Sequence, residues 1–149
     1  MEDYIDYWTV STHFETFKDS QLAIDTVQND FLVQQGKNQV LIVTIEREPI
    51  FKEGKELTDL YSSSSLLFEL NNEDSIVTPN NPLKSKLLRK LIAFSPEHGI
   101  KKLYKEEKIK LVRIDPNSWK IESKLQELDL SATLNFKANQ DLIIRHKEY

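Results

Sequence analysis

A two-residue hydrophobic alternation in the last third of the chain is the feature that most constrains the fold. Its clearest run has apolar residues at every second position: Leu128, Leu130, Ala132, Leu134 and Phe136. This period puts apolar side chains on one face of a β-strand and polar ones on the other, as in an antiparallel sheet with one solvated face. Similar runs over 109–114 and 119–125 flank an Asp-Pro-Asn turn at 115–117. Together with a further short strand over 142–146, these runs predict a C-terminal antiparallel meander.

The first third of the chain has the pattern of strand, helix and strand. Aromatic and β-branched residues over 4–14 and a continuous apolar run over 39–46 predict two strands, the second covered on both faces. Between them, Asp19 or Ser20 suits a helix start and Gly36 a helix end. Apolar residues recur at helical spacing in this segment: Leu22, Ala23, Val27, Phe31 and Leu32. A β-α-β start follows, with a right-handed crossover if the two strands are parallel.

The middle of the chain combines breakers with two helix-start signals. Residues 47–80 contain Pro, Gly, Asn-Asn and a run of four serines. Asn81-Pro82 has the residue types preferred at a helix start. One apolar face follows over 82–94: Leu83, Leu87, Leu88, Leu91 and Ile92. Ser95-Pro96-Glu97 repeats the start signal before a second, shorter helix at 100–104.

Length and composition agree with one globular domain. A chain of 149 residues with 39% apolar and 30% charged residues can bury a core. The expected fold is a single α+β domain over 1–149, with a β-α-β start, one or two basic amphipathic helices in the middle and a C-terminal antiparallel β-meander. The acidic N-terminus lacks the positive charge and apolar core of a signal peptide, and no apolar run reaches membrane-spanning length. With no cysteine either, we expect a cytoplasmic protein without membrane contact.

Several kinds of chemistry have no motif in this sequence. The three glycines are isolated, which excludes a P-loop and a dinucleotide fingerprint. The three histidines, His13, His98 and His146, form no closely spaced pair, and there is no Gly-x-Ser-x-Gly nucleophile elbow. We therefore expect no cofactor, no metal and no catalytic residue, in a protein that is not an enzyme.

Charge is strongly segregated along the chain. Residues 81–113 contain ten Lys or Arg and three Glu, whereas residues 1–80 contain 15 acids and five bases. Such asymmetry indicates a contact surface for a partner of opposite charge. The candidate partner-binding residues are the basic ones of the two expected helices: Lys84, Lys86, Arg89, Lys90, Lys101, Lys102 and Lys105.

This basic stretch over 82–108 allows three interpretations. It can bind an acidic protein partner or the acidic half of another copy, because complementary charge raises association rate and specificity. It can also bind nucleic acid through phosphate contacts, or it can be a solvated face balanced by the acids of residues 1–80. We favour a non-enzymatic protein–protein interaction protein, that is, an adaptor, an assembly subunit or an inhibitor, with nucleic-acid binding as the alternative.

One catalytic pattern remains as a remote alternative. Asp115 followed by Glu122 and Lys124 resembles the Asp…Glu-x-Lys arrangement of the restriction-endonuclease-like nucleases. The resemblance covers about ten residues and implies a magnesium-dependent nuclease, with two carboxylates on the metal and a lysine assisting the attacking water. A tight turn at 116–118 would, however, place the two carboxylates about 10 Å apart along the strands, too far to share one magnesium ion.

Overall fold

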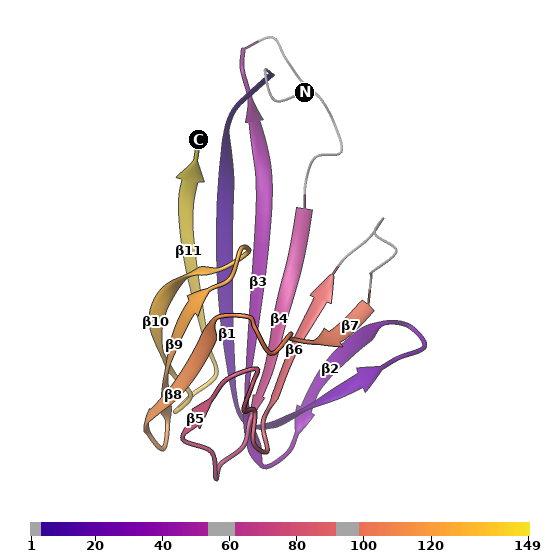
Figure 1. The fold of residues 1–149 in the computed structure, drawn as a ribbon, viewed down its shortest axis with the longest axis vertical. Coiled ribbons are helices and arrows are strands. Elements are labelled where there is room, and N and C mark those ends of the chain that lie inside the picture. The colour runs from indigo at the N-terminus through magenta and orange to yellow at the C-terminus, as the bar shows by residue number, and fades with distance from the viewer. Residues whose placement is uncertain (1–3, 54–61, 92–98) are drawn as a thin grey trace.

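The computed structural model describes residues 4–53, 62–91 and 99–149, and Figure 1 shows that the regular elements in these residues are β-strands. The strands are β1 (Ile5–Asp25), β2 (Asp30–Gln35), β3 (Asn38–Phe51), β4 (Ser62–Leu70), β5 (Ile76–Val77), β6 (Lys86–Leu91), β7 (Gly99–Lys102), β8 (Ile109–Asp115), β9 (Ser118–Lys124), β10 (Asp129–Asn135) and β11 (Gln140–Glu148). The α+β class is therefore wrong: the described part of the chain is all β. It contains no helix with the length and hydropathy needed to cross a membrane.

Two antiparallel sheets form the structure. Sheet A has the order β11-β1-β3-β4-β6-β7, with β2 paired to the far end of β1, and sheet B has the order β10-β9-β8-β5. The expected β-α-β start is wrong, because β1 and β3 are adjacent antiparallel strands and not a parallel pair joined by a crossover. In Figure 1 sheet B crosses the lower half of sheet A, and side chains from both sheets share one core that includes Phe14, Phe68, Trp119 and Phe136. We call this side of sheet A the core face.

Residues 20–36, predicted as a helix, form a β-hairpin from the end of β1 and from β2. Asp25 holds the turn, because its Oδ1 accepts hydrogen bonds from the backbone N–H groups of Val27 and Gln28 at 3.0 and 3.1 Å. The hairpin lies on the second face of sheet A, which we call the hairpin face. The side chains that pack there are Leu22, Ile24, Phe31 and Val33 from the hairpin and Val40, Ile42, Leu67, Leu88 and Ile100 from the sheet. Two short strands joined by a turn thus produced an apolar spacing that resembles a helix.

A buried carboxylate fastens this hairpin to the sheet. The register of β1 with β3 shifts near Asp19, whose φ is 45°, and β1 bends away at that point. Just beyond the bend, Glu69 of β4 accepts the Leu22 N–H at 2.6 Å and the Asn38 side-chain amide at 2.8 Å. Glu69 is only 6% exposed, so these hydrogen bonds offset the cost of burying its charge. Glu69 of β4 therefore adds a polar attachment to the apolar packing between the hairpin and sheet A.

The predicted basic helices are wrong in the parts that the structure describes. Residues 82–85 form a turn, residues 86–91 form β6, and the second helix is replaced by β7 and the residues after it. The Ser95-Pro96-Glu97 signal lies outside the described residues. Both faces of sheet A are covered here, so the consecutive Leu87 and Leu88 pack on opposite sides, Leu87 into the shared core and Leu88 under the hairpin. An apolar pattern on both faces of a strand has no period of two.

The last strand also differs from the prediction. The strands β8, β9 and β10 are consecutive antiparallel neighbours in sheet B, but β11 does not close their meander. It crosses to sheet A and pairs with β1, from Trp8↔Glu148 to Thr16↔Gln140. The chain end is thus the outer strand of sheet A on the side opposite β7.

Candidate binding site at the edge of β7

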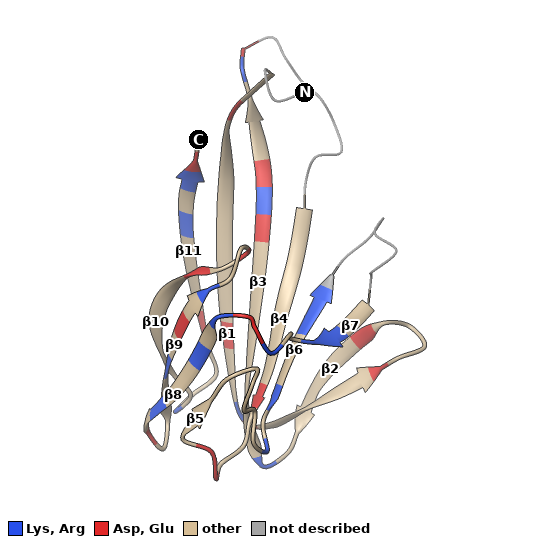
Figure 2. Ribbon diagram, viewed as in Figure 1, with Lys and Arg blue, Asp and Glu red and all other residues tan. Residues whose placement is uncertain are grey.

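The basic stretch lies on two adjacent strands at one side of sheet A. Figure 2 shows the Lys and Arg segments of β6 and β7 next to each other. Lys84 is in the turn before β6, and Lys105 is in the turn after β7. Lys86, Arg89 and Lys90 belong to β6, whereas Lys101 and Lys102 belong to β7. All seven predicted partner-binding residues therefore lie on two adjacent strands and the turns next to them, and not on helices.

Arg89 is occupied inside the protein. Its guanidinium donates to both carboxylate oxygens of Glu107 at 2.7 and 2.9 Å and to both of Glu127 at 2.6 and 3.0 Å. Its side chain is 14% exposed. Burial alone would lower the pKa of the Arg89 guanidinium, but its hydrogen bonds to the two glutamates raise that pKa above the ordinary value. Arg89 thus ties β6 to the turn before β8 and the turn after β9, and four of its five N–H donors are used within the chain.

The other three cations of the turn and β6 also have carboxylate neighbours. Lys84 pairs with Glu73, and its hydrogen bond lowers the pKa of that carboxyl. The Lys90 ammonium lies 2.9 Å from Asp30 Oδ1 at the hairpin tip, and this hydrogen bond lowers the pKa of Asp30. The Lys86 ammonium lies 4.0 Å from Glu69.

The cations of β7 and of the turn after it differ from those of β6 in their carboxylate neighbours. Within the described residues, Lys101, Lys102 and Lys105 have no carboxylate at ion-pair distance. All three are exposed. The positive charge available to a partner is therefore concentrated at β7 and its exit, and not over the whole basic stretch.

The outer edge of β7 also offers backbone groups. The Leu103 N–H donates to the Leu87 carbonyl at 3.1 Å, so the backbone groups of Leu103 point toward β6. Alternate residues of a strand point their backbone groups in opposite directions, so those of Ile100 and Lys102 point outward. No described strand pairs with this side of β7. An unpaired edge of this kind is a template for an added strand.

A half-enclosed groove of about 520 Å³ runs beside this edge. Its lining is mostly apolar, with two lysines: Ile24, Pro79, Pro82, Leu83, Ser85, Lys86, Leu87, Leu88, Ile100, Lys102 and Leu103. The volume is within the usual range of about 300–1,000 Å³ for binding pockets. Of the two lysines in the lining, Lys102 has no carboxylate neighbour among the described residues, whereas Lys86 lies near Glu69.

One wall of the groove is a turn held in an uncommon conformation. Leu83 has a φ of 53° and is 55% exposed, although a bulky residue at positive φ is a genuine outlier. Asp74, which is 4% exposed, fixes the turn: its Oδ2 accepts the Lys84 N–H at 3.0 Å and the Ser85 hydroxyl at 2.7 Å. Backbone strain of this kind is often found at binding sites.

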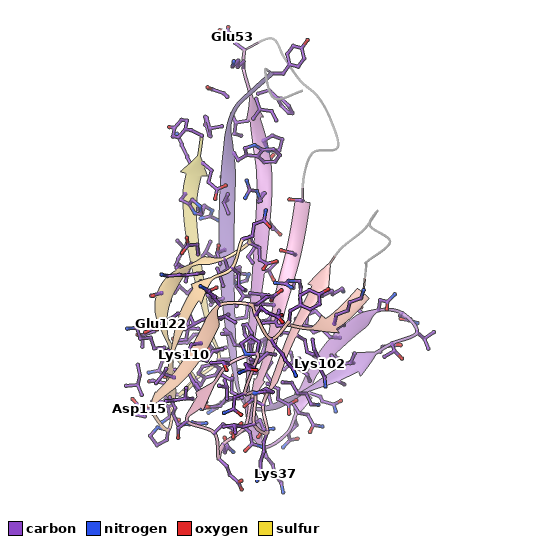
Figure 3. All side chains as sticks on the ribbon, viewed as in Figure 1. Lys37, Glu53, Lys102, Lys110, Asp115 and Glu122 are labelled. Atoms are coloured by element: carbon purple, nitrogen blue, oxygen red, sulfur yellow. The ribbon has the colours of Figure 1, made fainter. Side chains whose placement is uncertain are left out.

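The three residues of the nuclease pattern are not brought together. Asp115 pairs with Ser118 at the β8–β9 turn, and Glu122 lies four residues further along β9. At about 3.3 Å per residue, this is roughly 13 Å. Figure 3 shows Asp115 at the lower end of sheet B, with Lys110 and Glu122 together above it and Lys102 far from all three. Glu122 and Lys124 line an open hollow of about 570 Å³ that Asp115 does not reach.

Glu122 is paired with cations in this position. A hydrogen bond from Lys120 and the charge of Lys110 lower the pKa of the Glu122 carboxyl. Glu122 is thus the acid of a small cross-strand ion-pair group, with ammonium nitrogens at 3.2 and 3.6 Å.

The groove itself was not predicted from the sequence. Its lining comes from the hairpin, from β6 and β7, and from the turn that contains Pro82, which was interpreted as a helix start. The signal available was the Asn-Pro-Leu turn followed by consecutive leucines. Comparison of the chain with family models, with curated proteins and with solved structures found no match.

Proposed function

We propose that this protein is a non-enzymatic binding protein that takes an acidic segment of a partner protein along β7. It would act as an adaptor, an assembly subunit or an inhibitor. The observation that carries the proposal is the coincidence of three features at one place: the unpaired backbone edge of β7, an apolar groove beside it, and lysines without a carboxylate partner in the described residues.

The proposed contact is the addition of a short strand. The outward backbone groups of Ile100 and Lys102 would hydrogen-bond an extended segment, and pockets for alternate side chains would give specificity. Apolar side chains of that segment would contact Leu83 and Leu103, both in the groove lining. Carboxylates beside them would reach the ammonium groups, mainly accelerating association.

A peptide partner fits this site better than nucleic acid. Salt-dependent binding to nucleic acid grows with the number of phosphates that a protein neutralises. Most of the cations of 84–90 are engaged by carboxylates of the same chain, which leaves few for phosphates. Stacking of bases needs exposed aromatic rings, and Tyr104, at 62% exposure, is the large exposed aromatic residue next to β7.

Site-specific crosslinking tests the proposal. A photoreactive benzoylphenylalanine at Tyr104, close to β7, would be irradiated in nuclease-treated native lysate, and crosslinked peptides sequenced by mass spectrometry. The matched control places the same group at Thr133, an exposed position on β10. We expect Tyr104-specific crosslinks to a segment that combines acidic and apolar residues.

A charge-reversal pair makes the test decisive. Lys101→Glu with Lys102→Glu should abolish these crosslinks. Lys18→Glu with Lys137→Glu, the same charge change at two exposed positions away from the groove, should preserve them. Crosslinks that form in a parallel untreated lysate but not after nuclease treatment would favour nucleic acid, and crosslinks to a second copy would identify self-association. Equal yields from the Tyr104 and Thr133 positions would reject the proposal.

A further inference from the structure

Three potential metal ligands lie together on a part of sheet A that the groove does not include. His13 and Glu15 are two residues apart on β1, so they project from the same face. Glu15 pairs with Ile42, a residue of the hairpin-face cluster, which identifies that face as the hairpin face. On its other side Glu15 pairs directly with Asp141 of β11. The alternation of β1 and the register of β11 therefore place an imidazole and two carboxylates side by side.

The possible ligand atoms of these three side chains lie near one another. One ring nitrogen of His13 and one carboxylate oxygen each from Glu15 and Asp141 lie within 4.8 Å of one another. His13 Nε2 is 3.6 Å from Asp141 Oδ1, and His13 Nδ1 is 3.7 Å from Glu15 Oε1. The Nε2 atom is shielded from solvent, yet it has no hydrogen-bond partner within the described residues. A buried polar atom without a partner requires an explanation.

The electrostatics of the cluster also call for a cation. Glu15 and Asp141 are directly opposite each other, and like charges in that position destabilise a sheet. In the part of the chain that the structure describes, neither carboxylate has a Lys or Arg at ion-pair distance, and His13 is their only basic neighbour. A cation held between them would relieve the repulsion and would give His13 Nε2 a partner.

We infer that His13, Glu15 and Asp141 bind a divalent transition-metal ion of the zinc class. Imidazole and carboxylate are established zinc ligands, and three protein ligands leave one position open to water. Ligand atoms about 2.0–2.2 Å from zinc lie about 3.4 Å apart at a tetrahedral angle. A zinc ion binds one ring nitrogen of His13, so the three ligand atoms, which lie within 4.8 Å of one another, must come closer through rotation of the acidic side chains. These can move, because Glu15 is 34% exposed and Asp141 is 71% exposed. An imidazole ligand also favours zinc over magnesium, which prefers oxygen ligands.

The site would join the last strand of the chain to the sheet. Two ligands come from β1 and one from β11, the outer strand of sheet A. An ion bound there would link the two strands and reduce opening of this edge. Metal binding should therefore raise the melting temperature, and above the dissociation constant the rise should grow with the logarithm of the metal concentration. This inference is independent of the groove at β7, so either can fail without the other.

The test is calorimetric titration of the tag-free protein with zinc chloride and, separately, with magnesium chloride. We expect saturable 1:1 zinc binding and much weaker magnesium binding. Loss of a residue that supports a metal ligand typically costs about 10–100-fold in affinity, so His13→Gln and Asp141→Asn should each weaken zinc binding at least tenfold. His146→Gln, which removes another histidine of β11, is the matched control and should leave the affinity unchanged.

A second measurement protects the test against loss of folding. Thermal unfolding without metal should show that Asp141→Asn is as stable as the wild type or more stable, because it removes one of two like charges. Only the wild type and His146→Gln should then gain melting temperature on addition of zinc. Equal zinc affinity in His13→Gln and the wild type would overturn the inference. So would the absence of wild-type binding at millimolar zinc.

Discussion

The strands β6 and β7 are neighbours from one basic stretch of sequence, yet their cations have different roles. The cations from Lys84 to Lys90 are held by carboxylates of the hairpin, of β4 and of the turns around sheet B. The lysines of β7, Lys101 and Lys102, have no such partner in the described residues. The first group connects elements of the fold, whereas the second group is available for binding.

Position in the sheet explains this difference. β6 lies between β4 and β7 with a layer on each face, so its long side chains meet acidic residues of those layers. β7 is the last strand of its sheet, and its lysines extend toward solvent. A basic run along the sequence therefore contains both structural and available cations, and the sheet order separates them.

Arg89 is the strongest test of the structural group. Arg89→Ala would leave Glu107 and Glu127 close together without their cation, and breaking a buried pair in this way costs about 3–5 kcal/mol. We expect a loss of about 3 kcal/mol in the free energy of unfolding, measured by urea denaturation. Lys101→Ala, the matched change on β7, should shift it by less than about 0.5 kcal/mol.

A triple variant separates loss of the cation from loss of packing. Arg89→Leu combined with Glu107→Gln and Glu127→Gln removes all three charges, and replacing a buried ionic group with neutral residues is often close to neutral. Recovery of most of the lost stability would show that uncompensated carboxylates cause the effect. A stability as low as that of Arg89→Ala would instead assign it to packing of the long Arg side chain.

The same positional argument shows how much of the fold the sequence can predict. The sequence predicts strands where one face is wet, as in 128–136, because burial on one side leaves a clear period of two. It also predicts the buried strand at 39–46, where the apolar run is continuous and rich in β-branched residues. It fails at 20–36 and 82–91, where the pattern predicts helices and the structure has strands. In the hairpin the spacing spans a turn, and in β6 both faces are covered, so neither segment keeps the alternation. Strand order, including the transfer of β11 to sheet A, depends on long-range pairing that local patterns do not record.

The residues of the candidate sites could likewise be predicted only in part from the sequence. The sequence identifies all the lysines of the basic stretch, but it cannot separate Arg89 from Lys102, because their carboxylate neighbours are distant in sequence. The search for close histidine pairs missed His13, whose neighbour Asp141 is far along the chain. The available signal was His13-x-Glu15 on an expected strand, where residues two apart share a face.

Glu69 provides the second test, because it connects β4 to the hairpin and lies near a cation of β6. Glu69→Leu would remove the acceptor of the Leu22 N–H and of the Asn38 amide. Leaving a buried donor unsatisfied costs about 1–3 kcal/mol, so we expect a loss of about 2 kcal/mol by denaturation. Hydrogen exchange should show the loss of protection concentrated in residues 20–35. Uniform loss over both sheets would contradict a local role in fastening the hairpin.

The double charge reversal on β7 is the third test and concerns binding. Lys101→Glu with Lys102→Glu should slow association with the crosslinked partner at least about tenfold at low salt, because exposed charges act mainly on the association rate. Stability should change by less than about 0.5 kcal/mol, since neither lysine has a carboxylate partner among the described residues. Stopped-flow binding over a range of salt concentrations measures the first effect and urea denaturation the second. A large loss of stability would place these lysines in the structural group with Arg89.

The smallest expected effect is at the pair of Asp30 and Lys90, which is exposed at the hairpin tip. The pKa of Asp30 is lowered from 3.8, chiefly by the hydrogen bond from Lys90 and also by the N–H of Phe31. A carboxyl with a lowered pKa adds stability above its unfolded pKa and loses it as the pH falls through the folded value. The contribution of this pair should therefore be complete above about pH 5 and disappear as the pH falls below 3.8.

An NMR titration of the Asp30 carboxyl measures this directly. Lys90→Gln should move the pKa of Asp30 upward toward its ordinary value, but not all the way, because the Phe31 N–H still donates to Oδ1 at 2.8 Å. Lys101→Gln, on the adjacent strand, is the matched control and should leave the titration unchanged. If both variants shift Asp30 equally, the field of the whole basic stretch acts on the hairpin, and the distinction between paired cations on β6 and available cations on β7 would not hold at this position.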